Sequence, residues 1–302
     1  MTMRSFATFI GLFVIGFAVM AIATYPLYTL LTPQFDVAFH RVGTRLGMLV
    51  LLIGFTMVAR RLALDDRASL GYGLPRAAFL REAALGLALG VVTMSPIAAL
   101  MFALDLRTWS ADFTPTAANI AALLLQGASS GLAVALIEET FMRGAMHSAI
   151  ARESGTRTAI VLTALLYSAT HFIGRMHIAP ENVGPWSGVE LIRGTLAAFA
   201  DPSVIFDAFL CLALVGALLG MVRQITGNIA ACIGLHAGWV WVITWLRETS
   251  APNDAQPWRM LLSQFDGVVG WLVAAWTLVI GFALHAFYVR RVASGVGASE
   301  QR

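Results

Sequence analysis

Two adjacent carboxylates, Glu138 and Glu139, lie inside an apolar segment that is long enough to cross a membrane. Placing one ionised carboxylate at bilayer depth costs about 2.5–3.5 kcal/mol on insertion scales, and intramembrane polar residues are usually functional for that reason. This pair is therefore the first candidate site in the chain. Two isolated histidines, His171 and His236, occur in later apolar segments and are candidates for the same site.

Arg143 follows Glu139 by four residues, so on a helix the two side chains share a face, with the acid on the N-terminal side. Helical geometry turns Glu138 about 100° away from Glu139 and toward different neighbours. The spacing predicts an ion pair between Glu139 and Arg143 and leaves Glu138 without a partner on its own helix. The alternative interpretation is that both glutamates only brace the end of a helix.

His171 follows Tyr167 by four residues, which places the phenol ring and the imidazole on one helix face. Counted along the expected helices, Glu138, His171 and His236 lie roughly 12–21 Å from the same end of the bundle. The three side chains can therefore meet within one helix bundle. Each histidine taken alone is also explained as a structural hydrogen-bonding residue.

A carboxylate and an imidazole around one water molecule support general acid–base catalysis, in which the carboxylate takes a proton from water. The histidine then orients that water or stabilises a developing oxyanion. Two histidines and one carboxylate also match a catalytic zinc ligand set, with Glu138, His171 and His236 as the ligands. A proton-relay site of a transporter would use the same residue types. The residues alone leave these chemistries open.

A strongly apolar chain carries these residues. Of its 302 residues, 58% are hydrophobic and 12% are charged, whereas soluble domains carry about 25% charged residues. The composition predicts an all-α, polytopic membrane helix bundle with about eight transmembrane helices. Windows of about 20 residues place the spans at 6–31, 46–59, 80–104, 117–142, 158–173, 203–222, 228–246 and 267–289.

Charge and cysteine usage narrow the class further. Arginines are more frequent in the segments at one end of the predicted spans, and the positive-inside rule then predicts that both termini are cytoplasmic. The bacterial character of the chain suggests the bacterial cell (inner) membrane. A net charge of +3 gives no indication of nucleic-acid binding. Cys211 and Cys232 lack metal-ligand spacing and predict no disulfide framework. One membrane domain, 1–302, accounts for the whole sequence.

The pattern Glu138-Glu139-x-x-x-Arg143, then Tyr167-x-x-x-His171, then His236 resembles a known family. It is similar to the motifs of the CAAX prenyl protease and bacteriocin-processing (CPBP, abortive-infection) family of intramembrane endopeptidases. The resemblance covers residues 116–246, which we expect to form the catalytic core. Residues 1–115 and 247–302 would then be flanking transmembrane helices.

The resemblance implies a role for each motif residue. Glu138 would be the catalytic base that activates water, His171 would help to hold that water, and His236 would stabilise the oxyanion. Glu139, Arg143 and Tyr167 would be supporting residues. Family members are described both as metalloproteases and as metal-independent glutamate proteases. We favour the glutamate type without a cofactor; a zinc ion would instead be held by Glu138, His171 and His236.

Two positions depart from the family pattern. Tyr167 stands where the family usually has Phe, and Val240 stands where it usually has Asn, four residues after His236. The second change removes an expected oxyanion-hole donor, and such losses cost about 10²–10³ in kcat in other hydrolases. Asn228 and the indole N–H of Trp239 or Trp241 are candidate substitutes. The alternative is that Asn228 caps its helix and the tryptophan only packs.

The sequence as a whole predicts an intramembrane protease that hydrolyses a peptide bond within or near the bilayer, with a site that opens toward the cytoplasm. Its partners would be a peptide or membrane-protein substrate and the lipid bilayer. Val240 supports an alternative, a catalytically inactive membrane scaffold of the same fold that binds a partner. A proton-coupled carrier is weaker, because no internal repeat or pair of broken helices is visible.

Overall fold

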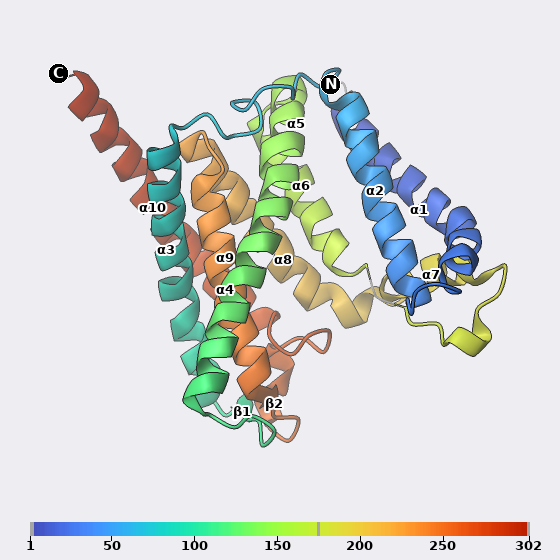
Figure 1. Ribbon diagram of the computed structural model, residues 1–302. Helices are drawn as coiled ribbons and strands as arrows, with labels where there is room; N and C mark the ends of the chain where they lie inside the picture. Colours follow the sequence, from blue (N-terminus) through green and yellow to red (C-terminus); the bar gives the residue numbers. More distant parts are fainter. Residues whose placement is uncertain (1–2, 174–175, 301–302) are drawn as a thin grey trace.

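The computed structural model describes residues 3–173 and 176–300 (Figure 1). Most of this part is helical, in agreement with the predicted fold class. The α-helices are α1 (Arg4–Leu31), α2 (Phe39–Ala59), α3 (Arg76–Ala103), α4 (Ala117–Glu139), α5 (His147–Ser154), α6 (Thr156–His171), α7 (Ser187–Thr195), α8 (Pro202–Thr226), α9 (Ala230–Thr249) and α10 (Trp271–Glu300). Short 3₁₀ segments cover Pro180–Asn182, Ala197–Ala200 and Pro257–Leu261.

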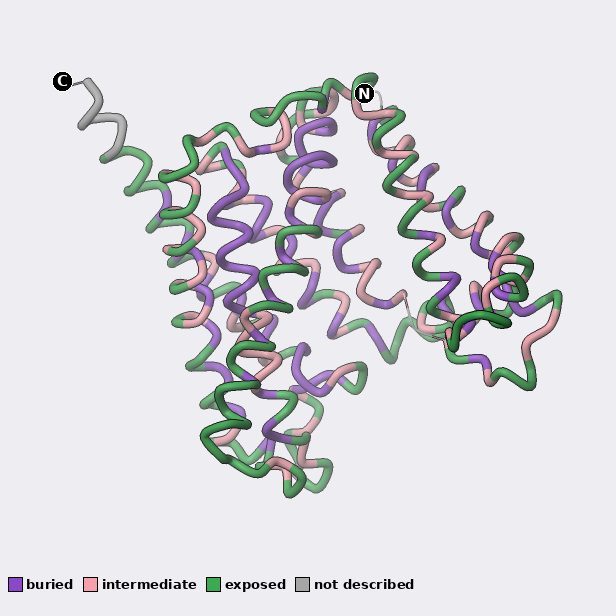
Figure 2. The backbone as a smooth tube through the Cα atoms, in the orientation of Figure 1, coloured by how far each residue is buried: buried purple, intermediate pink, exposed green. Residues whose placement is uncertain are grey.

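Six helical segments in the described part are long and apolar enough to cross a membrane, so this is a multi-pass membrane protein. They are Arg4–Leu31, Phe39–Ala59, Arg76–Ala103, Ala117–Ser154, Pro202–Thr226 and Trp271–Ser294. The other two predicted spans, 158–173 and 228–246, correspond to α6 and α9, which are helical but fall outside this set. The predicted number of about eight spans is therefore not confirmed. Figure 2 shows long exposed stretches on the outer helices, where Ile22 and Phe282 are 78% and 79% exposed, as expected for side chains that face lipid.

Two predicted span boundaries differ from the helices. α2 begins at Phe39 and not near residue 46, because His40, Arg41 and Arg45 lower the hydropathy of its first turns without preventing a helix. The span predicted at 117–142 continues through a π-helical segment, Thr140–Met146, into α5 and ends at Ser154.

The long helices alternate in direction through the bundle. α1 begins and α10 ends at the upper edge of Figure 1, and the loop between α2 and α3 lies there too. At the lower edge, β1 (Arg107–Trp109) pairs antiparallel with β2 (Ser250–Pro252), the one departure from an all-α fold in the described residues. Both ends of the described chain therefore lie at one edge of the bundle. That this edge is cytoplasmic remains a prediction.

α9 is the central helix of the site and packs closely between α3 and α4. Small residues allow this approach: Gly86 and Gly90 on α3 face Gly234 and Gly238 on α9. A Cβ atom added at Gly238 would lie 2.6 Å from the carbonyl oxygen of Leu87. Small residues at helix interfaces bring backbones together in membranes. Because His236 lies between the two α9 glycines, this contact fixes its depth and direction.

The π-helical segment follows directly on the glutamate pair. A π segment has a wider turn than an α-helix and is frequent at functional sites. The main-chain carbonyl of Arg143 accepts a hydrogen bond from Nε of Arg223 on α8, at 3.1 Å. Phe141, in the same segment, contacts Phe9 and Phe13 of α1 and Phe55 of α2, with ring centroids 5.5–6.2 Å apart. The segment thus connects the α1–α2 hairpin to the rest of the bundle.

Candidate active site

Glu139 and Arg143 form the ion pair that their spacing predicts. Nη1 of Arg143 lies 3.0 Å from Oε1 of Glu139, and both side chains are fully buried. The arginine also donates through Nη2 to the carbonyl oxygen of Gly216 on α8, at 3.2 Å. Its guanidinium carbon lies 4.5 Å from the centre of the Tyr167 ring on α6. Arg143 therefore joins three helices around one buried charge.

His236 on α9 reaches the same carboxylate. Its Nδ1 lies 2.8 Å from Oε1 of Glu139, while its Nε2 lies 3.9 Å from Oε2 of Glu138. The histidine thus forms its hydrogen bond with Glu139 and presents its other nitrogen toward Glu138. An ionised carboxylate only accepts hydrogen bonds, so Nδ1 carries the proton of this bond. In the neutral ring Nε2 is then an acceptor, and it becomes a donor only in the doubly protonated form.

Glu138 is the accessible member of the pair. Its side chain is 34% exposed, against 0% for Glu139. Its Oε2 atom is nevertheless buried and has no hydrogen-bond partner among the described residues. A buried polar atom without a partner is costly and calls for an explanation such as an ion, a water or a catalytic role. Glu138 is therefore the carboxylate of this site that is available to a reacting molecule.

His171 lies at the last residue of α6, one turn after Tyr167. Its Nδ1–H donates to the carbonyl oxygen of Tyr167 at 2.8 Å, because a carbonyl can only accept. The Tyr167 ring lies between the two histidines, with centroids 4.5 Å from His171 and 6.0 Å from His236. Within the described part, His171 makes no direct hydrogen bond to either glutamate. Its free Nε2 is an acceptor in this tautomer.

A cavity of about 480 Å³ adjoins these residues and is formed by side chains of α3, α4, α6, α8, α9, α10 and the loop before α10. His171, His236 and Tyr167 line one part of it. Arg247 and Asp266 line the opposite part, and the walls between them are mainly apolar. The side chain of Arg247 is half exposed, whereas that of His236 is buried.

The position of Arg247 is relevant to the predicted membrane topology. Arg247 lies near the end of α9, at the edge of the bundle that carries β1 and β2 (Figure 1). The cavity therefore extends away from the edge where α1 begins and α10 ends. If both termini are cytoplasmic, the Arg247 end of the cavity lies at the opposite side of the membrane. The predicted opening of the site toward the cytoplasm remains a prediction.

Two of the predicted oxyanion substitutes, Asn228 and Trp239, already have hydrogen-bond partners. The side chain of Asn228 accepts from the N–H of Ala230 and donates to the carbonyl of Thr226, both at 2.9 Å, at the start of α9. Trp239 lines the cavity, but its indole N–H donates to Oγ1 of Thr93 at 3.0 Å. Val240 also lines the cavity and offers no donor. Asn228 does not line the cavity, and the single indole N–H of Trp239 is already used.

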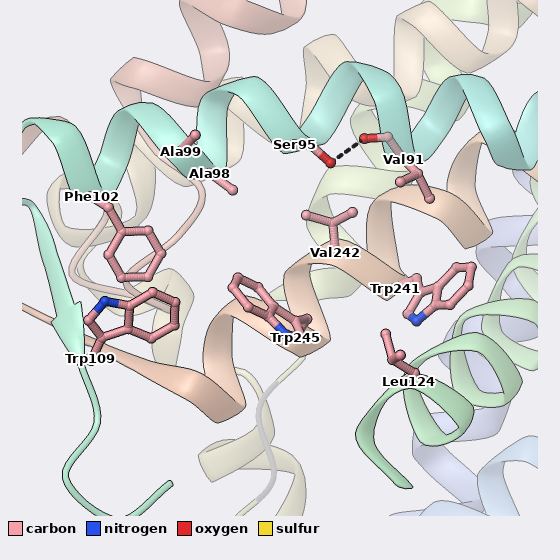
Figure 3. A pocket seen from close by; sticks show the side chains of 10 residues that line it. All are labelled: Val91, Ser95, Ala98, Ala99, Phe102, Trp109, Leu124, Trp241, Val242 and Trp245. Carbon is pink, nitrogen blue, oxygen red and sulfur yellow. Dashed lines mark hydrogen bonds between the residues drawn. The ribbon is translucent and has the colours of Figure 1, made fainter. Parts of the chain in front are cut away.

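A larger cavity of about 650 Å³ lies on another side of α9, between α3 and α4 (Figure 3). Trp109, Trp241 and Trp245 line it, and its walls are almost entirely apolar. The indole nitrogen of Trp241 is buried without a partner in the described part. No titratable side chain lines this cavity, so it offers no catalytic group.

The zinc alternative needs Glu138, His171 and His236 close together. In the described residues, no group of three or more His, Cys, Asp or Glu side chains is placed to hold a metal ion. The imidazole of His236 instead uses one nitrogen for Glu139, and the imidazole of His171 uses one for Tyr167. In each ring the nitrogen left free is Nε2.

The sequence did not predict three contacts of the site. These are the bond between His236 and Glu139, the carbonyl of Gly216 beneath Arg143, and the hydroxyl of Thr93 beside Trp239. Only the first had a sequence signal, since Glu139 was already a candidate next to Glu138. The other two depend on how close helices approach, which sequence spacing does not reveal.

In a comparison with protein families, residues 120–242 match the family model described as type II CAAX prenyl endopeptidase Rce1-like. The match contains Glu138, Glu139, Arg143, His171 and His236, and it confirms the resemblance predicted from the motifs. No curated protein and no solved structure matches the chain significantly.

Proposed function

Because residues 120–242 match the type II CAAX prenyl endopeptidases, we propose that this protein is an intramembrane endopeptidase of the glutamate type. Its substrate would be a membrane-associated peptide or protein, and it would be located in the inner membrane of a bacterial cell. The observation that carries the proposal is the pair of unequal glutamates. Glu139 is buried and bonded to Arg143 and His236, while Glu138 is accessible and faces Nε2 of His236.

The proposed reaction uses Glu138 as the general base. Its carboxylate takes a proton from a water molecule, and the resulting hydroxide attacks the carbonyl carbon of the scissile peptide bond. The carbonyl oxygen then carries a negative charge. When the tetrahedral intermediate collapses, the C–N bond breaks and Glu138 returns the proton to the leaving amine.

The histidines complete this site. In its doubly protonated form His236 donates from Nε2 to the oxyanion while Nδ1 stays on Glu139, so the ring keeps its orientation. His171, whose Nδ1 is held by Tyr167, can accept a hydrogen bond from the attacking water at Nε2, while the transferred proton goes to Glu138. Tyr167 packs against the guanidinium of Arg143, Arg143 pairs with Glu139, and Glu139 holds His236 in place. The family match supports a protease over the inactive scaffold that Val240 suggests.

The test is cleavage of a quenched fluorescent peptide library by the purified protein in detergent, with Glu138→Gln and His236→Ala as variants. Each is measured with and without a chelator. Activity that both substitutions abolish and the chelator leaves unchanged supports the glutamate mechanism. Activity that is lost to the chelator and restored by zinc would assign Glu138, His171 and His236 to a metal instead. Folded wild type without activity on any peptide would favour the scaffold.

A further inference from the structure

The cavity carries a cation at the end away from the histidines. Among the described residues that line it, Arg247 is the one basic side chain other than the two histidines, and it is half exposed. Its guanidinium is held by Oδ2 of Asp266 in the loop before α10. The other oxygen, Oδ1, accepts the N–H groups of Val268 and Val269, both at 2.9 Å. Asp266 is thus fixed by the main chain and orients Arg247.

A second cation, Arg107, lies near this pair but does not line the cavity. Asp266 offsets one arginine, but the nearby Arg107 has no carboxylate partner within the described part. The buried guanidinium of Arg107 donates to the hydroxyl and carbonyl of Ser250 and to the carbonyl of Gly267, next to Asp266. Burial lowers the pKa of Arg107, yet an arginine in a protein stays charged. Arg107 and Arg247 thus both lie near Asp266, and a second carboxylate, Asp207, is hydrogen bonded to Ser263 in the same loop.

Arg247 also has donors to spare. Only its Nη2 has a partner in the described residues, so Nε and Nη1 are available to a second carboxylate. Arginine binds carboxylates with two parallel N–H donors, a geometry that a lysine does not offer. The mainly apolar walls between this end and His236 suit an extended peptide with apolar side chains.

The register of α9 sets the distance between the two ends. Arg247 follows His236 by eleven residues, close to three helical turns, so both side chains face the same cavity. Eleven residues rise about 16 Å, and helical side chains tilt toward the N-terminus. An extended peptide covers about 3.3–3.6 Å per residue. The separation therefore corresponds to roughly three to five substrate residues.

We propose that Arg247, oriented by Asp266, is a specificity-determining residue that binds a carboxylate of the substrate three to five residues from the cleaved bond. That carboxylate is either the free C-terminus or the side chain of an Asp or Glu. The inference rests on the proposed endopeptidase activity and adds to it the position of an anionic anchor. Arg247 holds the peptide and takes no part in the proton transfers.

The test uses the best-cleaved library peptide in four forms: a free C-terminal acid, a C-terminal amide, the amide with a glutamate four residues beyond the cut, and the amide with a lysine there. Wild type is expected to cleave a carboxylate form with a KM about ten- to a hundredfold lower than that of the plain amide, with kcat similar. A preference for the free acid would identify the C-terminus as the bound carboxylate, and a preference for the glutamate form would identify an acidic side chain. Arg247→Gln removes the preference, and Arg247→Glu favours the lysine form. Arg259→Gln, a loss of charge at the same edge outside the cavity, keeps the wild-type pattern.

If Arg247 acts only in folding, Arg247→Gln lowers the cleavage of all four forms equally, and the proposal is wrong. Equal KM values of the four forms in wild type would also overturn the proposal, but they would leave the endopeptidase activity standing. The second measurement is binding of the same fluorescent peptides to Glu138→Gln, which does not depend on turnover. Preferential binding of a carboxylate form that Arg247→Gln abolishes supports the anchor even if wild type cleaves nothing. Binding without any preference overturns it.

Discussion

The imidazole of His236 is hydrogen bonded to Glu139, the buried glutamate, through Nδ1 and Oε1, which lie 2.8 Å apart. Two neighbouring residues of one type therefore hold different positions. Glu139 balances Arg143 and orients His236, whereas the side chain of Glu138 is 34% exposed. The division of tasks follows from the 100° turn between successive helical residues.

Substituting the two glutamates separately tests this division. Glu139→Gln removes the counter-charge of a fully buried Arg143, which is expected to cost about 3–5 kcal/mol of unfolding free energy. Glu138→Gln is expected to leave stability nearly unchanged and to lower kcat by about 10²–10⁴, the usual contribution of a general base. Denaturation in detergent and peptide cleavage measure the two effects. Equal losses of stability in both variants would contradict the assignment.

Val240 faces the cavity at the position where the family usually has a donor. Val240→Asn is expected to raise kcat, by up to about 10², because one oxyanion-hole donor is worth about 10²–10³ in other hydrolases. Val240→Leu is the matched control, since it resembles asparagine in shape and supplies no donor. Similar activities of the two variants would show that another group already stabilises the oxyanion.

The close contact of α3 and α9 allows a prediction about the free energy of unfolding of two glycine variants. Gly238→Ala places a methyl group 2.6 Å from a main-chain carbonyl of α3, and such overpacking costs about 1–3 kcal/mol. Gly11→Ala in α1 meets no atom within 4 Å and is expected to gain about 0.5–1 kcal/mol from its lower backbone entropy. Thermal unfolding of both variants in detergent checks the opposite signs. Activity should fall only for Gly238→Ala, because it displaces His236.

Topology can be measured with single cysteines in intact cells. If both termini are cytoplasmic, Ala255→Cys at the β1–β2 edge should react with a membrane-impermeant maleimide from outside. Ala68→Cys, in the loop between α2 and α3, should react only after permeabilisation. The native cysteines Cys211 and Cys232 are buried and give little background. The reverse labelling pattern would place the Arg247 end of the cavity on the cytoplasmic side.

The sequence predicted the long helices well because their apolar length is a local property. It was less accurate where polar residues lie inside a helix. The span predicted to end at Met142 continues to Ser154, because Arg143 is neutralised by Glu139 within the bundle and so does not end the helix. At α2, the charged first turns again hid the beginning of the helix at Phe39.

The same distinction applies to the site. The pairs Glu139–Arg143 and Tyr167–His171 each lie within one helix, so spacing alone was sufficient. The contact of His236 depends instead on the glycine interface of α3 and α9 and on the turn of α4. Sequence spacing therefore identified the participants but not which glutamate the histidine would bind. The Arg247–Asp266 pair belongs to no sequence motif, and only the folded structure places it in the wall of the cavity.

The π-helical segment also has a mechanical consequence. The bond from Arg223 to the main-chain carbonyl of Arg143, together with the bond from Arg143 to the carbonyl of Gly216, clamps α8 to the site at two heights. The bond from Arg223 holds the backbone of the segment that directly follows Glu139, so a sliding or rotation of α8 would pull on that segment. The position of α8 is thereby coupled to the ion pair that orients His236.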